Sequence, residues 1–199
     1  MRRTLVLSLA ALVLTGGLVT GCGSDSSSAP SSVSTTIKAA PTESNPAGDI
    51  PDNQAYVAYQ PAGGGFTVKV PEGWARTTKG STVIFTDKLN RIEITSGKAA
   101  TKPTPQSVKS DVVPVLQRQV PKFQMGKITV VSRPAGQAVL LTYQGDGTPD
   151  PVTGKAAHDA FERYSFFKAG RQVDLTLSGP VGADNVDPWR IVTDSFQWQ

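Results

Sequence analysis

Cysteine and histidine are nearly absent, since Cys22 and His158 are the only ones among 199 residues. A single cysteine excludes an internal disulfide, and this composition excludes a metal site built from several Cys or His ligands. A Ser-His-Asp hydrolase would have to use His158, yet no G-x-S-x-G motif occurs. Asp159 adjoins His158, but neighbouring side chains in a strand point to opposite faces. We therefore expect no enzyme, with a hydrolase as a remote alternative.

Charged residues and long apolar runs are also scarce. Only 18% of residues are charged, and the basic ones are scattered singly from Lys69 to Arg163. Nucleic-acid binding requires clustered Lys and Arg, so we expect no nucleic-acid partner. The apolar run Leu5–Leu14 would rise about 15 Å as a helix, half of a bilayer core of about 30 Å. No other stretch reaches the 18 apolar residues that a spanning helix needs.

The N-terminus has the order of a secretory signal. Arg2 and Arg3 precede the apolar run, and small residues follow it up to Cys22. Val19-Thr-Gly-Cys22 resembles the lipobox of bacterial lipoproteins, with Val19 where Leu is usual. The resemblance implies cleavage between Gly21 and Cys22 and acylation of Cys22, for instance with palmitate. The chain would then be anchored at the extracytoplasmic face of the membrane. An arginine pair so close to the N-terminus favours Sec over twin-arginine export.

A segment without aromatic residues follows this signal. Between Gly23 and Ile50, 20 of 28 residues are Ser, Thr, Pro, Gly or Ala. Such a composition cannot bury enough apolar surface to offset the entropy of ordering. We therefore expect a signal peptide over 1–21, a disordered tether over 22–54, and one globular, monomeric domain over 55–199.

Within this domain, apolar and polar residues alternate with the period of strands. Three strands are predicted first, over Phe66–Val70, Ser81–Thr86 and Arg91–Thr95. Lys168-Ala-Gly-Arg171 predicts a tight turn between the last two of four later strands. Those four are expected at about 126–133, 137–143, 157–168 and 171–178.

A first helix is predicted between the two groups of strands. Thr104 supplies an N-cap and Pro105 the first helical position. Pro114 removes a helical hydrogen bond, which predicts a kink or break near Val113. The apolar stripe of this helix consists of Val108, Val112, Val115 and Leu116.

A second helix is predicted near the C-terminus. Asp187 supplies its N-cap and Pro188 its first turn, and Trp189, Val192 and Phe196 share one face. We expect the Trp189 ring to be buried, so that its replacement by Ala costs about 3–5 kcal/mol of stability. The element order is then βββαββββα, and it predicts an α/β/α sandwich around a mostly antiparallel sheet.

Two segments and this element order resemble a known family. The segments are Phe66-Thr-Val-Lys-Val-Pro-Glu-Gly-Trp74 and Asp187-Pro-Trp-Arg-Ile-Val-Thr-Asp-Ser-Phe-Gln-Trp198. They resemble the Mog1/PsbP-like superfamily, and especially its actinobacterial envelope lipoproteins. The resemblance implies a non-catalytic binding or assembly module. It supplies no catalytic residue and no ligand.

Three loops contain residue types that also occur in ligand sites. Gly145–Gly154 contains two Asp residues but lacks the regular spacing and terminal Glu of a Ca²⁺-binding EF-hand loop. Asp184 and Asn185 suit a helix cap. Gly63-Gly-Gly65 lacks the Lys-Ser/Thr of a phosphate-binding loop. We therefore expect no metal and no cofactor.

Aromatic residues crowd one predicted strand. Alternation sends Phe161 and Phe167 to one face and Tyr164 and Phe166 to the other, with Tyr143 on the neighbouring strand. Two covering helices explain this pattern and favour a module that binds another envelope protein. An open groove lined by Tyr143, Tyr164 or Phe166 would instead favour a carrier or sensor of a lipid, a glycolipid or another small apolar ligand.

Overall fold

The structure is a computed structural model that describes residues 47–149 and 154–199. The expected signal peptide, the Gly21–Cys22 cleavage site with its acylated cysteine, and most of the tether lie outside the described residues. The described chain starts within the expected tether. Ile50 is buried, and its backbone N–H donates to Asn185 Oδ1 at 2.8 Å. The domain therefore includes residues on the N-terminal side of 55.

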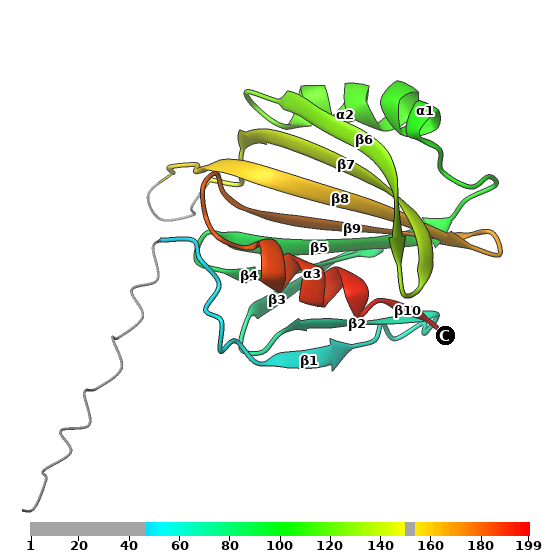
Figure 1. Cartoon of the computed structure of the whole chain (residues 1–199), viewed down its shortest axis with the longest axis horizontal. Coiled ribbons are helices and arrows are strands. Elements are labelled where there is room, and N and C mark those ends of the chain that lie inside the picture. The colour runs from blue at the N-terminus through cyan, green and yellow to red at the C-terminus, as the bar shows by residue number, and fades with distance from the viewer. Residues whose placement is uncertain (1–46, 150–153) are drawn as a thin grey trace, which may run out of the picture. The chain divides into compact units, whose positions relative to one another are not determined.

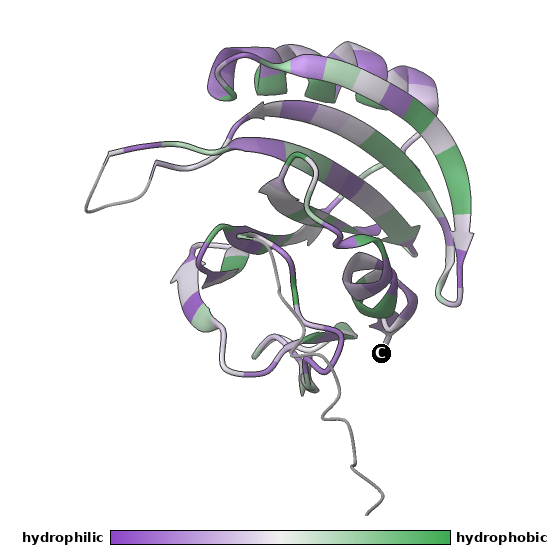
Figure 2. Cartoon of the chain, turned by 60° about the vertical axis from the view of Figure 1, so that its left-hand side comes forward, coloured by the Kyte–Doolittle hydropathy of each residue, from purple (hydrophilic) through white to green (hydrophobic). Residues whose placement is uncertain are grey.

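A seven-stranded, fully antiparallel sheet forms the centre of the domain (Figure 1). Its strand order is β3-β4-β5-β9-β8-β7-β6. The strands are β3 (Ala75–Lys79), β4 (Thr82–Asp87), β5 (Asn90–Lys98), β6 (Gln124–Arg133), β7 (Gly136–Asp146), β8 (His158–Lys168) and β9 (Arg171–Pro180). Hydrophobic and hydrophilic residues alternate along most of these strands (Figure 2), which gives the sheet two chemically different faces.

A second, three-stranded sheet of order β1-β2-β10 covers one of these faces together with the C-terminal helix. Its strands are β1 (Tyr56–Tyr59), β2 (Phe66–Pro71) and β10 (Gln197–Trp198), and the helix is α3 (Val186–Asp194). The layer on the other face is one irregular helix. Its parts are α1 (Pro105–Ser107), the π-helical η1 (Val108–Val112) and α2 (Val113–Gln119).

The predicted fold class, a mixed α/β fold with antiparallel strands and few helices, is confirmed. The predicted element order was incomplete, because it lacks β1, β3 and β10. The first predicted strand belongs to the small sheet and not to the large one. The layer opposite α1 and α2 therefore combines a helix with a sheet, where a helix alone was expected.

The first helix has the predicted cap and the predicted irregularity. Thr104 Oγ1 accepts a hydrogen bond from the Ser107 backbone N–H at 3.0 Å, and Ser107 Oγ accepts one from the Thr104 backbone N–H at 3.0 Å. The break takes the form of a π-helical turn ahead of Pro114, in which the Val113 N–H donates to the Val108 carbonyl. A π turn accommodates the missing N–H of proline without ending the helix.

The second helix differs from its prediction at the start. Asn185 is the N-cap residue and makes no capping bond, because its side chain bonds to Gly48 and Asn90 instead. Asp187 lies in the first turn and pairs with Arg190 at 2.9 Å. The Trp189 side chain packs against the core beneath α3, as expected, but it is only half-buried.

Aromatic rings dominate the core beneath α3. Phe196 lies just beyond the helix and is fully buried. Its ring stacks on Phe66 and Phe166, with centroid distances of 5.5 Å and 4.3 Å. Trp198 meets the same ring edge-on at 5.1 Å. This stack joins the small sheet, the large sheet and the C-terminus.

Candidate functional site

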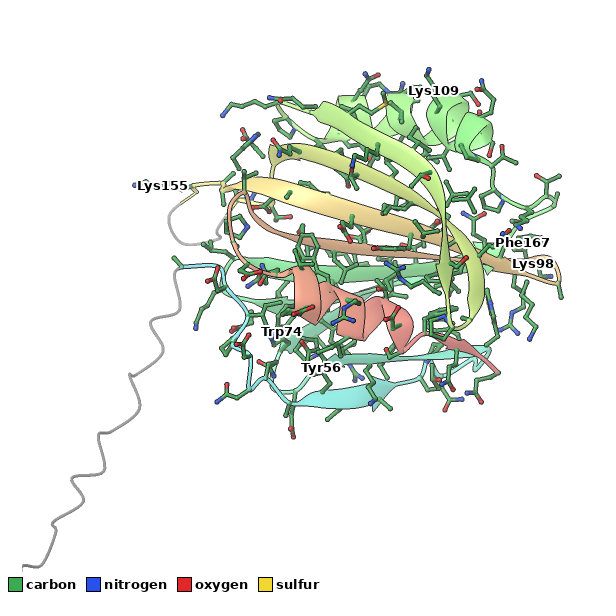
Figure 3. All side chains as sticks on the ribbon, viewed as in Figure 1. Tyr56, Trp74, Lys98, Lys109, Lys155 and Phe167 are labelled. Atoms are coloured by element: carbon green, nitrogen blue, oxygen red, sulfur yellow. The ribbon has the colours of Figure 1, made fainter. Side chains whose placement is uncertain are left out.

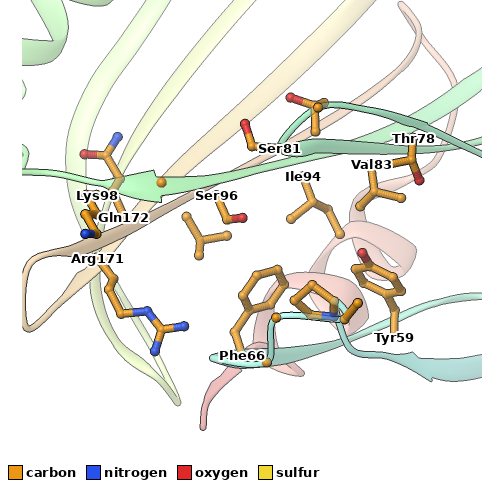
Figure 4. Close-up of a pocket in the computed structure, with 18 residues that line it drawn as sticks. Tyr59, Phe66, Thr78, Ser81, Val83, Ile94, Ser96, Lys98, Arg171 and Gln172 are labelled. Atoms are coloured by element: carbon orange, nitrogen blue, oxygen red, sulfur yellow. The ribbon is translucent and has the colours of Figure 1, made fainter.

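A cleft opens between the two sheets, next to the turn that joins β8 to β9. We call it the inter-sheet cleft; its volume is about 530 Å³, within the range of small-molecule sites. Its floor and walls contain apolar side chains from both sheets (Figure 4). They are Tyr59, Phe66, Val83, Ile94 and Val173. Thr78, Ser81, Thr82 and Ser96 add polar residues to the lining.

Basic side chains stand at the mouth of this cleft. Lys98 on β5, Arg171 on β9 and Lys168 on β8 are directly opposite one another across adjacent strands. We call these three residues the cation row. All three are exposed, and none takes part in an ion pair of the described residues. No acidic residue lines the cleft.

The loop between β1 and β2 brings the small sheet close to Arg171. A Cβ atom at Gly65 would collide with the Arg171 guanidinium, and Gly65 has a positive φ of 98°. The positive φ favours glycine at this position, whereas the exposed Arg171 side chain could move away from a Cβ atom. The first two residues of the Gly63-Gly-Gly65 run, which the sequence predicts to be a loop without phosphate-binding chemistry, line the inter-sheet cleft.

The other face of the large sheet carries a second hollow, of about 630 Å³, that we call the sheet-face cup. α2 contributes Leu116 to its rim, and the sheet contributes Tyr143 and Phe161, whose rings stack at 4.5 Å. Burial raises the pKa of Tyr143 to about 12. Arg91 pairs with Glu93 at 2.7 Å on its floor.

A polar network continues along this face of the sheet. Arg163 pairs with Asp174 at 2.9 Å, and Ser165 and Gln172 also donate to the Asp174 carboxylate. Arg163 Nε is buried and has no hydrogen-bond partner among the described residues. Most of this carboxylate's bonding capacity is therefore used within the sheet.

A third hollow, of about 370 Å³, lies between α3 and the edge of the large sheet. We call it the Trp189 hollow. The half-buried Trp189 ring and the Glu162 side chain line it. Met125, which is 47% exposed, lines it from the edge strand β6.

The three aromatic residues predicted as ligand-binding candidates do not share a pocket. Tyr164 and Phe166 lie in the core beneath α3, whereas Tyr143 lies on the opposite face of the sheet. The Tyr164 hydroxyl donates to Glu162 at 2.7 Å and accepts from Arg133 at 3.0 Å, and burial raises its pKa. Only Tyr143 lines hollows large enough for a ligand, and its binding role remains a prediction.

His158 and Asp159 point to different environments, as strand alternation requires. His158 is partly exposed and its Nδ1 lies 3.3 Å from Asp146 Oδ1. A hydrogen bond from Lys122 lowers the pKa of Asp146, and the contact with His158 acts in the same direction. Asp159 is buried, its Oδ1 has no hydrogen-bond partner in the part of the chain that the structure describes, and this burial raises its pKa to about 6.

Within 47–149 and 154–199, no helix is long and apolar enough to cross a membrane. The same ranges contain no group of three His, Cys, Asp or Glu side chains placed to hold a metal ion.

Several solved structures share this arrangement. PsbP of the cyanobacterium Synechocystis is 15% identical over 73% of this chain and 94% of its own, with a TM-score of 0.52. The fold is Mog1/PsbP-like. The Ran-binding protein Mog1p of Saccharomyces cerevisiae is 10% identical over 72% of this chain and 95% of its own, with a TM-score of 0.50.

A larger protein of Bacteroides thetaiotaomicron is 9% identical over 71% of this chain, with a TM-score of 0.51. The aligned part of this chain spans about half of that protein, 48%. No protein-family model matches the sequence. No curated protein matches it either. Identities this low establish the Mog1/PsbP-like fold alone.

Sequence reasoning missed the cation row. Arg171 was noticed only as the end of a tight turn, and that turn is confirmed by positive φ angles of 49° at Ala169 and 76° at Gly170. The alternating pattern places Arg171 at the start of a predicted strand, whereas Lys98 lies beyond the predicted strand Arg91–Thr95. Their juxtaposition depends on the pairing of β5 with β9, for which the sequence carries no local signal.

Proposed function

We propose that the protein is a lipid-anchored, non-catalytic module that binds another protein at the extracytoplasmic face of the cell membrane. The N-terminal order of basic, apolar and small residues up to Cys22 supports the anchor. In this proposal the tether holds the domain clear of the lipid headgroups, and the domain supplies the binding surface.

The observation that carries the binding role is the Trp189 hollow. Trp and Met are enriched in protein interfaces, and tryptophan is prominent among the residues that contribute most binding energy. Here a half-buried Trp189 ring lies beside an exposed Met125 at the rim of an open hollow. A partner side chain inserted into this hollow would bury both residues at the same time.

The edge of the large sheet adds a second means of recognition. β6 pairs with β7 on one side, and no strand within 47–149 and 154–199 pairs with its outer edge. Exposed sheet edges offer unpaired N–H and C=O groups to an incoming strand. The register shift between Met125 and Ile128 lies at the end of β6 nearest to the hollow. A precedent for protein recognition on this fold is the Ran-binding protein Mog1p.

Site-specific photo-crosslinking in living cells tests the surface. A photoreactive amino acid at Met125 should yield one discrete protein adduct, and Trp189→Ala in the same chain should abolish it. Val115 is the matched control, because it is also exposed but lies on α2 on the opposite side of the sheet. Equal adducts from both positions, or none from Met125, would contradict the proposed surface.

Fractionation tests the anchor independently. Cys22→Ala should move the protein from the membrane fraction to the soluble fraction and should eliminate incorporation of labelled palmitate. Because Cys22 is the only cysteine of the chain, loss of the label in Cys22→Ala would assign the acyl groups to this residue. A signal-cleaved Cys22→Ala chain that stays with the membrane would refute the anchor and leave the docking surface to be judged by crosslinking.

A further inference from the structure

We infer that the inter-sheet cleft binds a single-chain amphiphile with an anionic headgroup, of the fatty-acid class. The alkyl chain would occupy the space between the sheets, and the headgroup would contact Lys98 and Arg171 at the mouth. This site is separate from the Trp189 hollow, so the inference does not depend on the proposed protein partner.

The unbalanced charge at the mouth is the first argument. Like charges directly opposite each other on neighbouring strands are destabilising. The cation row places Lys98, Arg171 and Lys168 in that relation, without an ion pair to any described carboxylate. An anion at this position would remove the repulsion and satisfy guanidinium N–H groups.

The direction of the Arg171 side chain is the second argument. It extends from the first residue of β9 toward the start of β2, across the cleft mouth (Figure 4). Its guanidinium packs against Gly65, and no protein acceptor bonds to it within the described residues. Lys98 lies at the same end of the large sheet (Figure 3). Both residues therefore line the end of the cleft at which a headgroup would leave it.

The apolar interior is the third argument, because a small inorganic anion at the mouth would leave this interior unfilled. Apolar side chains line the cleft from four strands: Phe66 at the start of β2, Val83 on β4, Ile94 on β5 and Val173 on β9. An alkyl chain gains about 0.8 kcal/mol for each methylene that it buries. The volume of about 530 Å³ lies in the lower half of the usual range for ligand pockets, which favours one chain over two.

Calorimetric titration of the full chain carrying Cys22→Ala tests this inference. Palmitate is the probe, used below its aggregation concentration. Methyl palmitate keeps the alkyl chain and lacks the charge, and inorganic phosphate keeps an anion and lacks the chain. Palmitate should bind with one site per chain. Methyl palmitate should bind at least about tenfold more weakly, and phosphate should give no heat of binding.

Two variants locate the site. Lys98→Gln combined with Arg171→Gln should weaken palmitate binding about tenfold or more. Lys88→Gln combined with Lys109→Gln removes two equally exposed charges elsewhere and should leave it unchanged. Ser96→Trp should fill the cleft and abolish binding while both cations remain. Unchanged melting temperatures would show that each variant is folded.

Three outcomes would overturn the inference. The first is no palmitate binding by the parent chain, and the second is equal binding by the Lys98/Arg171 double variant. The third is binding to anionic phosphatidylglycerol vesicles that depends on the two cations while palmitate alone does not bind. That third result would assign the cation row to the membrane surface and leave the cleft without a ligand.

Discussion

The two faces of the large sheet are built from the same strands but differ in polarity and in how completely other elements cover them. The face beneath α3 and the small sheet is apolar, and its aromatic stack runs from Phe66 through Phe196 to Phe166. The face beneath α1 and α2 is apolar only where those helices lie, next to Tyr143 and Leu141. Farther across that face, charged and hydroxyl side chains bond to one another.

This difference shows how one sheet can combine stability with accessible surface. Strand alternation lets each β-strand send apolar residues to one side and polar residues to the other. The apolar side is closed by two elements from opposite ends of the domain, β2 and α3. The polar side needs no complete cover, because Arg163, Ser165 and Gln172 together satisfy the Asp174 carboxylate.

The largest expected effect comes from opening the aromatic stack. Phe196→Ala should lower the free energy of unfolding by about 3–5 kcal/mol, since it removes a fully buried ring from three aromatic contacts. Phe123→Ala, which removes a half-buried ring on the other face, should cost clearly less. Urea denaturation of both variants measures the difference. Equal losses would mean that the two faces contribute equally to stability.

Next in size is the polar network on the open face. Asp174→Ala should cost about 2–3 kcal/mol, because it leaves the partly buried Arg163 without its counter-charge. Replacing both partners, with Arg163→Met and Asp174→Leu, should cost less than the single change. Thermal and urea unfolding check this order. A double variant that is less stable than Asp174→Ala would show that the network contributes more than charge compensation.

A smaller, pH-dependent effect is expected at Asp159. Its pKa of about 6 in the folded protein exceeds the ordinary value of 3.8. Between about pH 4 and pH 6 the unfolded chain releases this proton while the folded chain retains it, so stability falls as the pH rises. Asp159→Asn should therefore be about 1–2 kcal/mol more stable than the parent at pH 7.

The same variant has an internal control. Below about pH 4 the carboxyl group is protonated in both states, and the gain from Asp159→Asn over the parent should be largely gone. Unfolding free energies measured at several pH values from 3.5 to 7 reveal the slope. A gain that is constant over this range would exclude titration of Asp159 as its cause.

The smallest effect calibrates the others. Arg190 and Asp187 form an exposed ion pair on α3, with side chains 64% and 74% exposed. Arg190→Ala should change stability by no more than about 0.5 kcal/mol, because water screens such pairs. A change comparable to that of Asp174→Ala would show that burial does not distinguish the two ion pairs.

The strands that the sequence predicted are those with one buried and one more exposed face. Phe66–Val70 and Arg91–Thr95 alternate because every second residue lies in the core. β3 escaped prediction because it is an edge strand whose residues are all exposed, so Ala75–Lys79 carries no alternating signal. β1 was missed for a related reason, as Val57 and Ala58 face solvent in succession.

For the candidate sites, local patterns separated the faces of one strand but not the neighbours across strands. Alternation correctly placed Phe161 opposite to Tyr164 and Phe166. Alternation did not reveal that Tyr143 is paired with Phe161 on the neighbouring strand. This pairing places Tyr143 on the face opposite to Tyr164 and Phe166, so the three residues do not share a pocket. The burial of Trp189 was overestimated because helix spacing specifies a face and not the depth to which that face is covered.

The sequence by itself predicted most strands, both helices and the break near Pro114, and it also predicts a targeting segment and a segment without aromatic residues ahead of the domain. These follow from composition, from short-range periodicity and from backbone chemistry, all of which act over a few residues. Only the tertiary structure decided that β2 leaves the large sheet and that Lys98 meets Arg171 across 73 positions of sequence. Such pairings depend on the packing of the whole chain, since a strand can satisfy its hydrogen bonds with many partners and only the shared core selects one.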